Sequence, residues 1–279
     1  MTALTGLIGY PVSHSLSPRI HDFWIKEHGL DAAYKLFTTA PARLRQTMLH
    51  MRKKEVRGVN ITIPHKQAVM EYLDDTDANA RAIGAVNTVT NRDGKFVGSN
   101  TDAYGFITNL REGLTGKPDG DITNYLQHVV VLGAGGATRA IIVALQQAGA
   151  KTITLTNRSF DKAQILANHF NLTALPWEVR AEALSEATLL VNTTSLGMAG
   201  HPPLELGLSA LPKSAAVHDI VYAPLETPLL FAAAKQGHQT VDGLGMLLYQ
   251  AQAAFELWHG VKPKVTKALR DHVLEPHHG

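Results

Sequence analysis

The chain has 279 residues, of which 45% are hydrophobic and 18% are charged. These are ordinary globular values, and a length of this order corresponds to roughly two domains, so a disordered chain is excluded and a single small module is disfavoured. Lysine plus arginine number 26 against 24 for aspartate plus glutamate. So small an excess indicates no surface for nucleic acid or for anionic membranes. The absence of cysteine excludes disulfides, cysteine metal sites and a thiol nucleophile.

No targeting or metal signal stands out. The N-terminus lacks the basic start and apolar run of a secretory signal, and no segment approaches the roughly 20 apolar residues of a membrane span. We therefore expect a cytoplasmic protein with neither a membrane nor a nucleic-acid partner. The 14 histidines are scattered, and the terminal His277-His278 is typical of a solvated end, so we expect no metal.

Short apolar runs alternate with helical periodicity, which indicates the α/β class with parallel strands. In the first part of the chain the pattern predicts strands at 4–9, 33–37 and 58–63, and helices from 17, at 43–54 and at 64–72. Ser17 would be the N-cap of the first helix, with Pro18 as its first helical residue. A hairpin is expected from 85–91 and 95–99, and the first domain is expected to end near Asp102.

The second part begins with a continuous β-branched run at 129–132, which is typical of a strand buried on both faces. Strands at 152–156, 188–191 and 216–221, with helices of about 10 residues between them, predict a doubly wound sheet. That domain is expected to end near Gly237. Helices are expected at 244–258 and 265–273, and their position in the chain leaves open which domain they pack on.

A glycine-rich segment lies between the buried run and a helical pattern that stops at Gly149. Glycines permit a tight turn and close backbone approach, and the N–H groups and positive dipole end of a helix suit a pyrophosphate. Thr138 stands where the usual fingerprint has Gly or Ala, and a tight turn without a ligand is the alternative. We expect a dinucleotide site that contains Gly133, Ala134, Gly135, Gly136 and Ala137.

The end of the next strand favours NADP over NAD as cofactor. Asn157, Arg158 and Ser159 follow it, and no Asp or Glu stands about 20 to 25 residues after the first glycine, where an NAD enzyme holds the ribose hydroxyls. Arg158 can form a bidentate pair with a 2′-phosphate, with Ser159 and Lys162 nearby. The alternative is that Arg158 is a solvated loop cation, partly neutralised by Asp161.

Lys66 and Asp102 are candidates for proton transfer. Pro64 would place Lys66 in the first turn of a helix, where the dipole disfavours a cation by roughly 0.3–1 kcal/mol. Such a position suits a proton-transferring lysine, although an exposed lysine is an equal alternative. Asp102 precedes the helical pattern at 104–111, where an aspartate is an excellent N-cap, and capping is the stronger interpretation from spacing alone. Sequence spacing does not show whether the two side chains meet.

Two serines before the first predicted helix are candidates for holding a carboxylate. Ser15 and Ser17 are hydroxyl donors on a turn next to a helix N-terminus. Capping by Ser17 is compatible with that role.

Seven separate motifs occur in order along the chain. They are Ser13-His14-Ser15-Leu16-Ser17-Pro18, Asn60-Ile61-Thr62-Ile63-Pro64-His65-Lys66, Gly84-Ala85-Val86-Asn87-Thr88, Asn100-Thr101-Asp102, the glycine loop with Arg139-Ala140, Asn192-Thr193-Thr194-Ser195-Leu196-Gly197-Met198, and Asp242-Gly243-Leu244-Gly245-Met246 leading to Gln250. With these motifs the chain resembles the shikimate dehydrogenase family, NADP oxidoreductases of the shikimate pathway, along nearly its whole length. Asp22 departs from the Asn of many relatives, and the loop at 200–203 varies in length among them.

The resemblance implies two domains with an active site in the cleft between them. The first is an α/β substrate domain at 1–103, completed by C-terminal helices at 238–279, and the second is a Rossmann-type NADP-binding domain at 104–237. Lys66 and Asp102 would form the catalytic pair. Ser15 and Ser17 would bind the substrate carboxylate, and the ring hydroxyls would be held by Thr62, Asn87, Asp102, Tyr222 and Gln250. The cofactor would contact Gly133 to Ala137, Asn157, Arg158, Ser159, Lys162, Ile220 and Gly243.

Each of these roles has a structural alternative. Tyr222 can simply pack at a strand end, and Asn87 and Thr62 can satisfy backbone groups of the hairpin. Gln250 is a long polar side chain on an otherwise apolar helix face, which modestly favours a substrate contact.

The implied reaction is the reversible reduction of 3-dehydroshikimate to shikimate with NADPH, a step in aromatic amino acid biosynthesis. One alternative is an enzyme of the same family that uses quinate, with NAD; two serines at positions 15 and 17 weakly favour shikimate. Another alternative is a non-catalytic NADP sensor, which would have little reason to retain both Lys66 and Asp102. The sequence leaves open whether the protein is a monomer or a homodimer.

Overall fold

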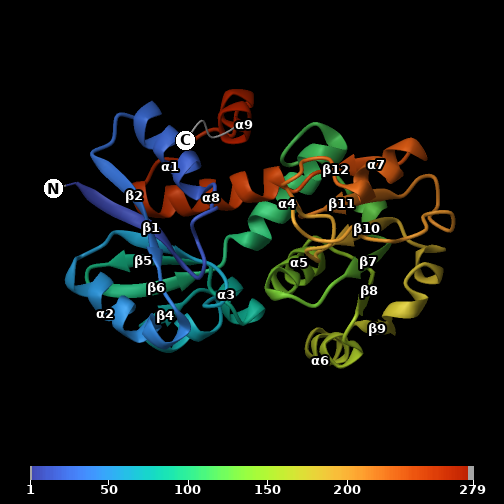
Figure 1. The fold of residues 1–279 in the computed structure, drawn as a ribbon, viewed down its shortest axis with the longest axis horizontal. Coiled ribbons are helices and arrows are strands. Elements are labelled where there is room, and N and C mark those ends of the chain that lie inside the picture. Colours follow the sequence, from blue (N-terminus) through green and yellow to red (C-terminus); the bar gives the residue numbers. More distant parts are fainter. Residues whose placement is uncertain (1, 276–279) are drawn as a thin grey trace. The chain divides into compact units, whose positions relative to one another are not determined.

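The computed structural model describes residues 2–275, and the chain folds into two compact units. The first unit contains the residues up to Asp102 and those from Leu248 onward, and the second contains Ala103–Leu247 (Figure 1). The interpretation of His277-His278 as a solvated end lies outside the described residues.

The first unit is built on a six-stranded mixed sheet with the order β2-β1-β3-β5-β6-β4. β1 pairs in parallel with β2 and β3, whereas β5 is antiparallel to both β3 and β6. The predicted hairpin is therefore confirmed as β5–β6, and the sheet is less uniformly parallel than predicted. The strands are β1 Ala3–Gly9, β2 Ala32–Thr38, β3 Gly58–Ile61, β4 Asp75–Thr76, β5 Thr88–Arg92 and β6 Lys95–Ser99.

Amphipathic helices bury their apolar sides against this sheet. The core under α2 combines Met48 and Met51 with Ile8, Val59 and Phe96, and burial of such side chains contributes about 1.5–3 kcal/mol each. The helices of this unit are α1 Ser17–Glu27, α2 Leu44–Lys53, α3 Ala78–Ile83, most of α8 Leu244–His259, α9 Lys267–Leu274, and the 3₁₀ turns η1 Pro41–Arg43 and η2 Ala68–Tyr72. α8 carries the chain back into the first unit, because the unit boundary falls within it.

The helix expected at 64–72 is wrong in its first half. Helical order begins only at Ala68, and Lys66 lies in a turn. The Lys66 carbonyl accepts a hydrogen bond of 2.7 Å from the N–H of Val86, so it is directed across to a neighbouring segment rather than along a helix axis. Lys66 therefore does not lie in the first turn of a helix, contrary to the prediction from the sequence. The N-cap assignment also changes, since Leu16 is the N-cap of α1 and Ser17 is its first residue.

The second unit has a six-stranded sheet with the order β12-β11-β10-β7-β8-β9, and every pair is parallel. Counted along the chain this is the 3-2-1-4-5-6 order of a doubly wound dinucleotide-binding fold, so the predicted fold class is confirmed. The strands are β7 His128–Leu132, β8 Thr152–Asn157, β9 Thr173–Pro176, β10 Leu189–Asn192, β11 Ala216–Asp219 and β12 Gln239–Val241.

In this sheet, the two strands missing from the sequence interpretation are its edges, β9 and β12. Both are short and partly exposed, so they lack the continuous apolar run that marks a strand buried on both faces. Because β12 belongs to this sheet, the second unit continues past Gly237 to Leu247. Its helices are α4 Asp102–Thr115, α5 Gly136–Gln147, α6 Phe160–Phe170 and α7 Pro228–Lys235, with the 3₁₀ turns η3 Thr123–Leu126, η4 Trp177–Val179 and η5 Glu182–Leu184.

A buried histidine on β11 gives this unit a pH-dependent stability. His218 is fully buried, its Nε2 lies 3.1 Å from the Asn109 amide nitrogen, and burial lowers its pKa from 6.5 to about 3. Between pH 6.5 and about pH 3, His218 is protonated in the unfolded chain and uncharged in the folded chain. The free energy of unfolding therefore falls as the pH drops below 6.5, by up to about 1.4 kcal/mol per pH unit.

His218→Gln keeps an acceptor for Asn109 and removes the titration. We expect the loss of stability between pH 7 and pH 5 to be smaller in this variant than in the wild type, by about 2 kcal/mol. Urea unfolding of the full chain at both pH values measures the difference. The exposed His201 supplies the matched control, His201→Gln, which should follow the wild type. Equal pH dependence of wild type and His218→Gln contradicts the assignment.

Candidate active site

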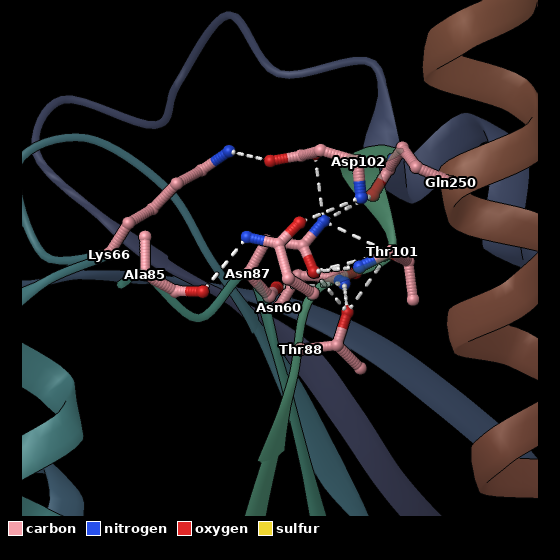
Figure 2. Close-up of polar contacts among 9 residues, drawn as sticks. Asn60, Lys66, Ala85, Asn87, Thr88, Thr101, Asp102 and Gln250 are labelled. Atoms are coloured by element: carbon pink, nitrogen blue, oxygen red, sulfur yellow. Dashed lines mark hydrogen bonds and ion pairs between the residues drawn. The ribbon is translucent and has the colours of Figure 1, made fainter. Parts of the chain in front are cut away.

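Lys66 and Asp102 meet in the first unit, which their spacing in the sequence did not reveal. The Lys66 Nζ lies 2.5 Å from Asp102 Oδ2 (Figure 2), and the two side chains are 20% and 8% exposed. Partial burial lowers the effective dielectric constant around the pair, so their attraction exceeds that of a surface ion pair. An ammonium group held in this way can give or take a proton at a fixed position.

Asn87 is the centre of the surrounding hydrogen bonds. Its Nδ2 donates to Asp102 Oδ1 at 2.8 Å, to Thr101 Oγ1 at 2.9 Å and, more weakly, to Gln250 Oε1 at 3.4 Å. Its Oδ1 accepts from the Thr101 N–H at 2.8 Å. Figure 2 shows the Asn87 amide joined by dashed lines to Asp102 and to the side chain of Gln250, which comes from α8. The amide therefore orients the carboxylate while Lys66 binds its other oxygen.

Backbone contacts fix the segments that carry these side chains. The Asn100 side chain donates from Nδ2 to the Ala85 carbonyl at 2.9 Å and accepts the Asp102 N–H at 3.0 Å. Together with the bond between Val86 and Lys66, these contacts bring Lys66, Asn87 and Asp102 to one end of the sheet. Asp102 begins α4, yet its two carboxylate oxygens face Asn87 and Lys66.

Three residues of this cluster were not singled out by sequence reasoning. Asn60 donates to Thr88 Oγ1 at 3.2 Å, and Thr88 donates to Asn87 Oδ1 at 2.9 Å, while Thr101 contacts both Asn87 and Thr88. All three are buried. For Asn60 the available signal was a polar residue inside the otherwise apolar strand β3, because such a group needs partners when it is buried.

The remaining substrate candidates of the first unit lie near strand and helix ends. Ser15 Oγ accepts the Ser17 N–H at 3.2 Å, so this hydroxyl orders the start of α1. Ser17 itself is buried and makes no cap bond. Thr62 directly follows β3, and its N–H donates to the Ile8 carbonyl at 2.9 Å. Tyr222 belongs to the second unit, where burial raises the pKa of its phenol.

The glycine loop of the second unit connects β7 to α5 as predicted. Gly133 has φ of +105°, in the region that favours glycine, and a Cβ there would lie 2.7 Å from Thr193 Oγ1. A Cβ on Gly135 or Gly136 would meet no heavy atom within 4 Å. The space beside the N-terminus of α5 is therefore open, and the N–H groups of this helix end can donate hydrogen bonds to an anion there.

Thr138 departs from the usual fingerprint for a visible reason. Its buried hydroxyl accepts the Gly135 N–H at 2.9 Å and lies 2.8 Å from Thr193 Oγ1. It thus ties the glycine loop to the segment after β10. Asn157 acts in a similar way from the end of β8, because its Oδ1 accepts the Ala134 N–H at 3.1 Å and its Nδ2 donates to the Ser159 carbonyl at 2.9 Å.

The side chains expected to bind the 2′-phosphate of the NADP ribose lie next to the glycine loop. Arg158, Ser159 and Lys162 are exposed on the segment where β8 leads into α6. Parallel strands end at the same edge of a sheet, so the ends of β8 and β7 are neighbours. Two cations near this edge can bind an anionic group of a ligand.

Ile220, which follows β11, lies against Gly243, which follows β12. A Cβ on Gly243 would be 2.2 Å from the Ile220 carbonyl oxygen, so only glycine permits this approach. The preceding Asp219 is buried and accepts from Asn192 at 3.0 Å, Val221 N–H at 3.0 Å and Thr227 at 2.8 Å. Burial raises the pKa of its carboxyl to about 6 despite these bonds. The aspartate therefore joins the loops that follow β10 and β11.

Within residues 2–275, no group of three or more His, Cys, Asp or Glu side chains is arranged to hold a metal ion. Over the same residues, every helix is too short or too polar to span a bilayer.

Three family models match successive parts of the chain. Residues 7–89 match the shikimate dehydrogenase substrate binding domain, residues 121–198 match shikimate / quinate 5-dehydrogenase, and residues 243–274 match the shikimate 5'-dehydrogenase C-terminal domain. The chain is 48% identical over 274 residues to shikimate dehydrogenase (NADP(+)) from Paramagnetospirillum magneticum, an alignment that covers 97% of this chain and 98% of that protein.

Solved structures agree with these matches. Shikimate 5-dehydrogenase from Thermus thermophilus, in complex with NADP(H) and shikimate, is 36% identical with a TM-score of 0.85, over 97% of this chain and 98% of that one. Quinate dehydrogenase from Corynebacterium glutamicum, in complex with NAD, is 33% identical with a TM-score of 0.89, over 98% and 99%. With the Lys66–Asp102 pair and the doubly wound second unit, these similarities show that the chain belongs to the shikimate dehydrogenase family.

Proposed function

We propose that the protein catalyses the reversible NADP-dependent interconversion of shikimate and 3-dehydroshikimate. The observation that carries this proposal is the partly buried pair of Lys66 and Asp102, held by Asn87 at the end of the first sheet. When bound, NADPH would supply the hydride for reduction, and NADP⁺ would accept it in the oxidation. The protein's own residues bind and orient the substrate and move the proton.

Lys66 is the proton-transferring group in this proposal. In the direction of reduction its Nζ donates a proton to the oxygen that becomes the hydroxyl, and in the direction of oxidation it takes that proton back. Asp102 holds the ammonium group in place and stabilises its charge through the 2.5 Å contact. Asn87 and Gln250 offer amide groups to ring hydroxyls, Thr62 offers a further hydroxyl, and Ser15 and Ser17 bind the carboxylate.

The second unit fits a dinucleotide. The open space beside Gly135 and Gly136 accommodates a pyrophosphate at the N-terminus of α5. Asn157 orders the loop, and Arg158 with Ser159 and Lys162 offers charge and a hydroxyl to a 2′-phosphate. Ile220, after β11, and Gly243, after β12, complete the proposed cofactor site.

The direct test is nicotinamide absorbance with purified protein, with shikimate or quinate offered against NADP or NAD in all four combinations. Reduction of NADP by shikimate is the expected result. The similarity to a quinate dehydrogenase with NAD makes quinate oxidation with NAD the second candidate, which turnover in that combination alone would establish. No absorbance change in any of the four combinations contradicts both candidate activities and favours a non-catalytic NADP-binding role.

Arg158→Ala is expected to raise the KM for NADP by roughly 10- to 100-fold, because charge-assisted hydrogen bonds contribute about 1.5–3 kcal/mol. The KM for NAD should change little, since NAD has no 2′-phosphate. Initial rates with both cofactors measure the ratio. Arg92→Ala, at an exposed arginine of the β5–β6 hairpin, is the matched control. An unchanged preference for NADP in Arg158→Ala contradicts the proposed phosphate contact.

A further inference from the structure

Tyr34 is hydrogen-bonded to the catalytic cluster, although none of the seven sequence motifs contains it. It lies on β2, only 6% exposed, and its phenol oxygen is 2.8 Å from Asn60 Oδ1. A carboxamide oxygen only accepts hydrogen bonds, so the phenol donates. The Asn87 carbonyl fixes which end of the Asn60 amide faces Tyr34, because this carbonyl only accepts and therefore takes the N–H₂ group, which leaves the oxygen for Tyr34.

The other end of the amide faces the catalytic cluster. Asn60 Nδ2 lies 3.2 Å from Thr88 Oγ1 and 3.3 Å from the Asn87 carbonyl. Thr88 in turn donates to Asn87 Oδ1, and Asn87 donates to Asp102. The hydrogen bonds therefore run without a break from Tyr34 to the carboxylate that binds Lys66, as Figure 2 shows from Asn60 onward.

Tyr34 is itself held by α1. The His21 ring stacks on the Tyr34 ring with centroids 4.2 Å apart and planes within 4°. His21 is fully buried, and burial lowers its pKa to about 3, so it stays an uncharged stacking partner. The hydroxyl of Ser17, at the start of α1, bonds to the Tyr34 phenol, and the backbone of Tyr34 bonds to Asp22. The Tyr34 phenol thus connects Ser17, at the start of α1, to Asn60.

Loss of the phenol hydroxyl would affect the orientation of Asn60. Asn60 is only 5% exposed, and a buried carboxamide oxygen without a donor is costly. Rotation of the amide by half a turn would not restore the lost bond, because the oxygen would then face the Asn87 carbonyl, acceptor against acceptor, and the N–H₂ group would face the phenyl ring. The Asn60 amide would therefore be held from one side only, by Thr88 and the Asn87 carbonyl. The geometry that Asn87 imposes on Asp102 would then loosen.

We propose that Tyr34 is a positioning residue of the active site, which acts by fixing the orientation of the Asn60 carboxamide. This inference rests on the proposed function only in its kinetic test, which measures turnover of shikimate. Phenylalanine at position 34 keeps the ring that stacks on His21 and packs beside Leu7 and Trp258, so Tyr34→Phe removes the hydroxyl alone.

Tyr34→Phe is expected to lower kcat/KM for shikimate about ten-fold, as the loss of one buried hydrogen bond at a positioned site predicts. The KM for NADP should stay within about two-fold, and Tm should fall by no more than about 4 °C. Tyr72→Phe, at a half-buried tyrosine of the same unit, is the matched control and should leave every parameter unchanged. Unaltered kcat/KM for shikimate in Tyr34→Phe overturns the proposal, whereas an inactive wild type overturns the proposed function.

A double-mutant cycle separates positioning from general loss of stability. If Tyr34 acts through Asn60, then Tyr34→Phe added to Asn60→Ala should cause no further loss, whereas independent effects should multiply. A second readout needs no substrate: in asparagine labelled with ¹⁵N, the Asn60 side-chain N–H₂ hydrogens should exchange with water faster in Tyr34→Phe than in the wild type. Multiplying losses or unchanged exchange would each contradict the proposal.

Discussion

Replacing Lys66 by alanine is expected to lower kcat for shikimate oxidation by roughly 10²- to 10⁴-fold, the contribution of a positioned general acid or base. The KM for shikimate should change by only a few-fold, because the proton moves in the transition state and an interaction made there is lost from kcat. Steady-state rates at saturating NADP measure both parameters. Fluorescence titration with NADPH checks that cofactor binding persists, since the glycine loop lies in the other unit.

Lys53→Ala, at an exposed lysine near the end of α2, is the matched control and should retain wild-type kinetics. An unchanged kcat in Lys66→Ala would show that Lys66 does not transfer the proton. Asp102 would then have to be interpreted as a structural residue. A raised KM with unchanged kcat would instead show that Lys66 binds the substrate and does not transfer the proton.

Asp102→Asn is expected to lower kcat by roughly 10²-fold or more, and the structure gives the reason. Both carboxylate oxygens accept, one from Lys66 and the other from Asn87. An amide has a single acceptor oxygen, so its N–H₂ group must face either the ammonium of Lys66 or the amide of Asn87, donor against donor. The partly buried ammonium of Lys66 also loses its counterion, which removes a charge-assisted bond. Steady-state kinetics with shikimate and NADP provide the measurement.

The exposed Asp119 supplies the matched control, Asp119→Asn, which should behave as the wild type. Thermal unfolding of Asp102→Asn is the second measurement, because a misfolded variant also loses activity. A folded Asp102→Asn protein with wild-type kcat would contradict the proposed pairing with Lys66. Combined with Lys66→Ala, the variant should show losses that do not multiply, since the two residues act as one unit.

The local sequence pattern was sufficient to predict the segments whose structure is decided by residues close together in the chain. The run at 129–132 is a strand whose Val129–Leu132 side chains are fully buried, because consecutive β-branched residues suit a strand covered on both faces. The glycine loop and the start of α5 follow it as predicted. The edge strands β9 and β12 were missed, since a short, half-exposed strand has no distinctive apolar pattern.

The prediction from the local sequence pattern was wrong where a group bonds to a segment that is distant in the sequence. A proline followed by polar residues predicted a helix from Pro64, yet the Lys66 carbonyl bonds to Val86 and helical order waits until Ala68. Spacing suggested that Asp102 caps a helix, and the structure shows its oxygens bound to Lys66 and Asn87. In both cases the tertiary partner lies many residues away, where no window of sequence can show it.

The sequence by itself determined the α/β class, the glycine loop before α5 and the residue types that the chemistry needs. The tertiary structure alone decided which of these residues meet. It joined Lys66 to Asp102, placed the residues from Leu248 onward in the first unit, and linked Tyr34 to the catalytic cluster through Asn60. The physical reason is that propensity and periodicity act over a few neighbouring residues, whereas a buried polar group takes its partner from whichever segment the packed core brings to it.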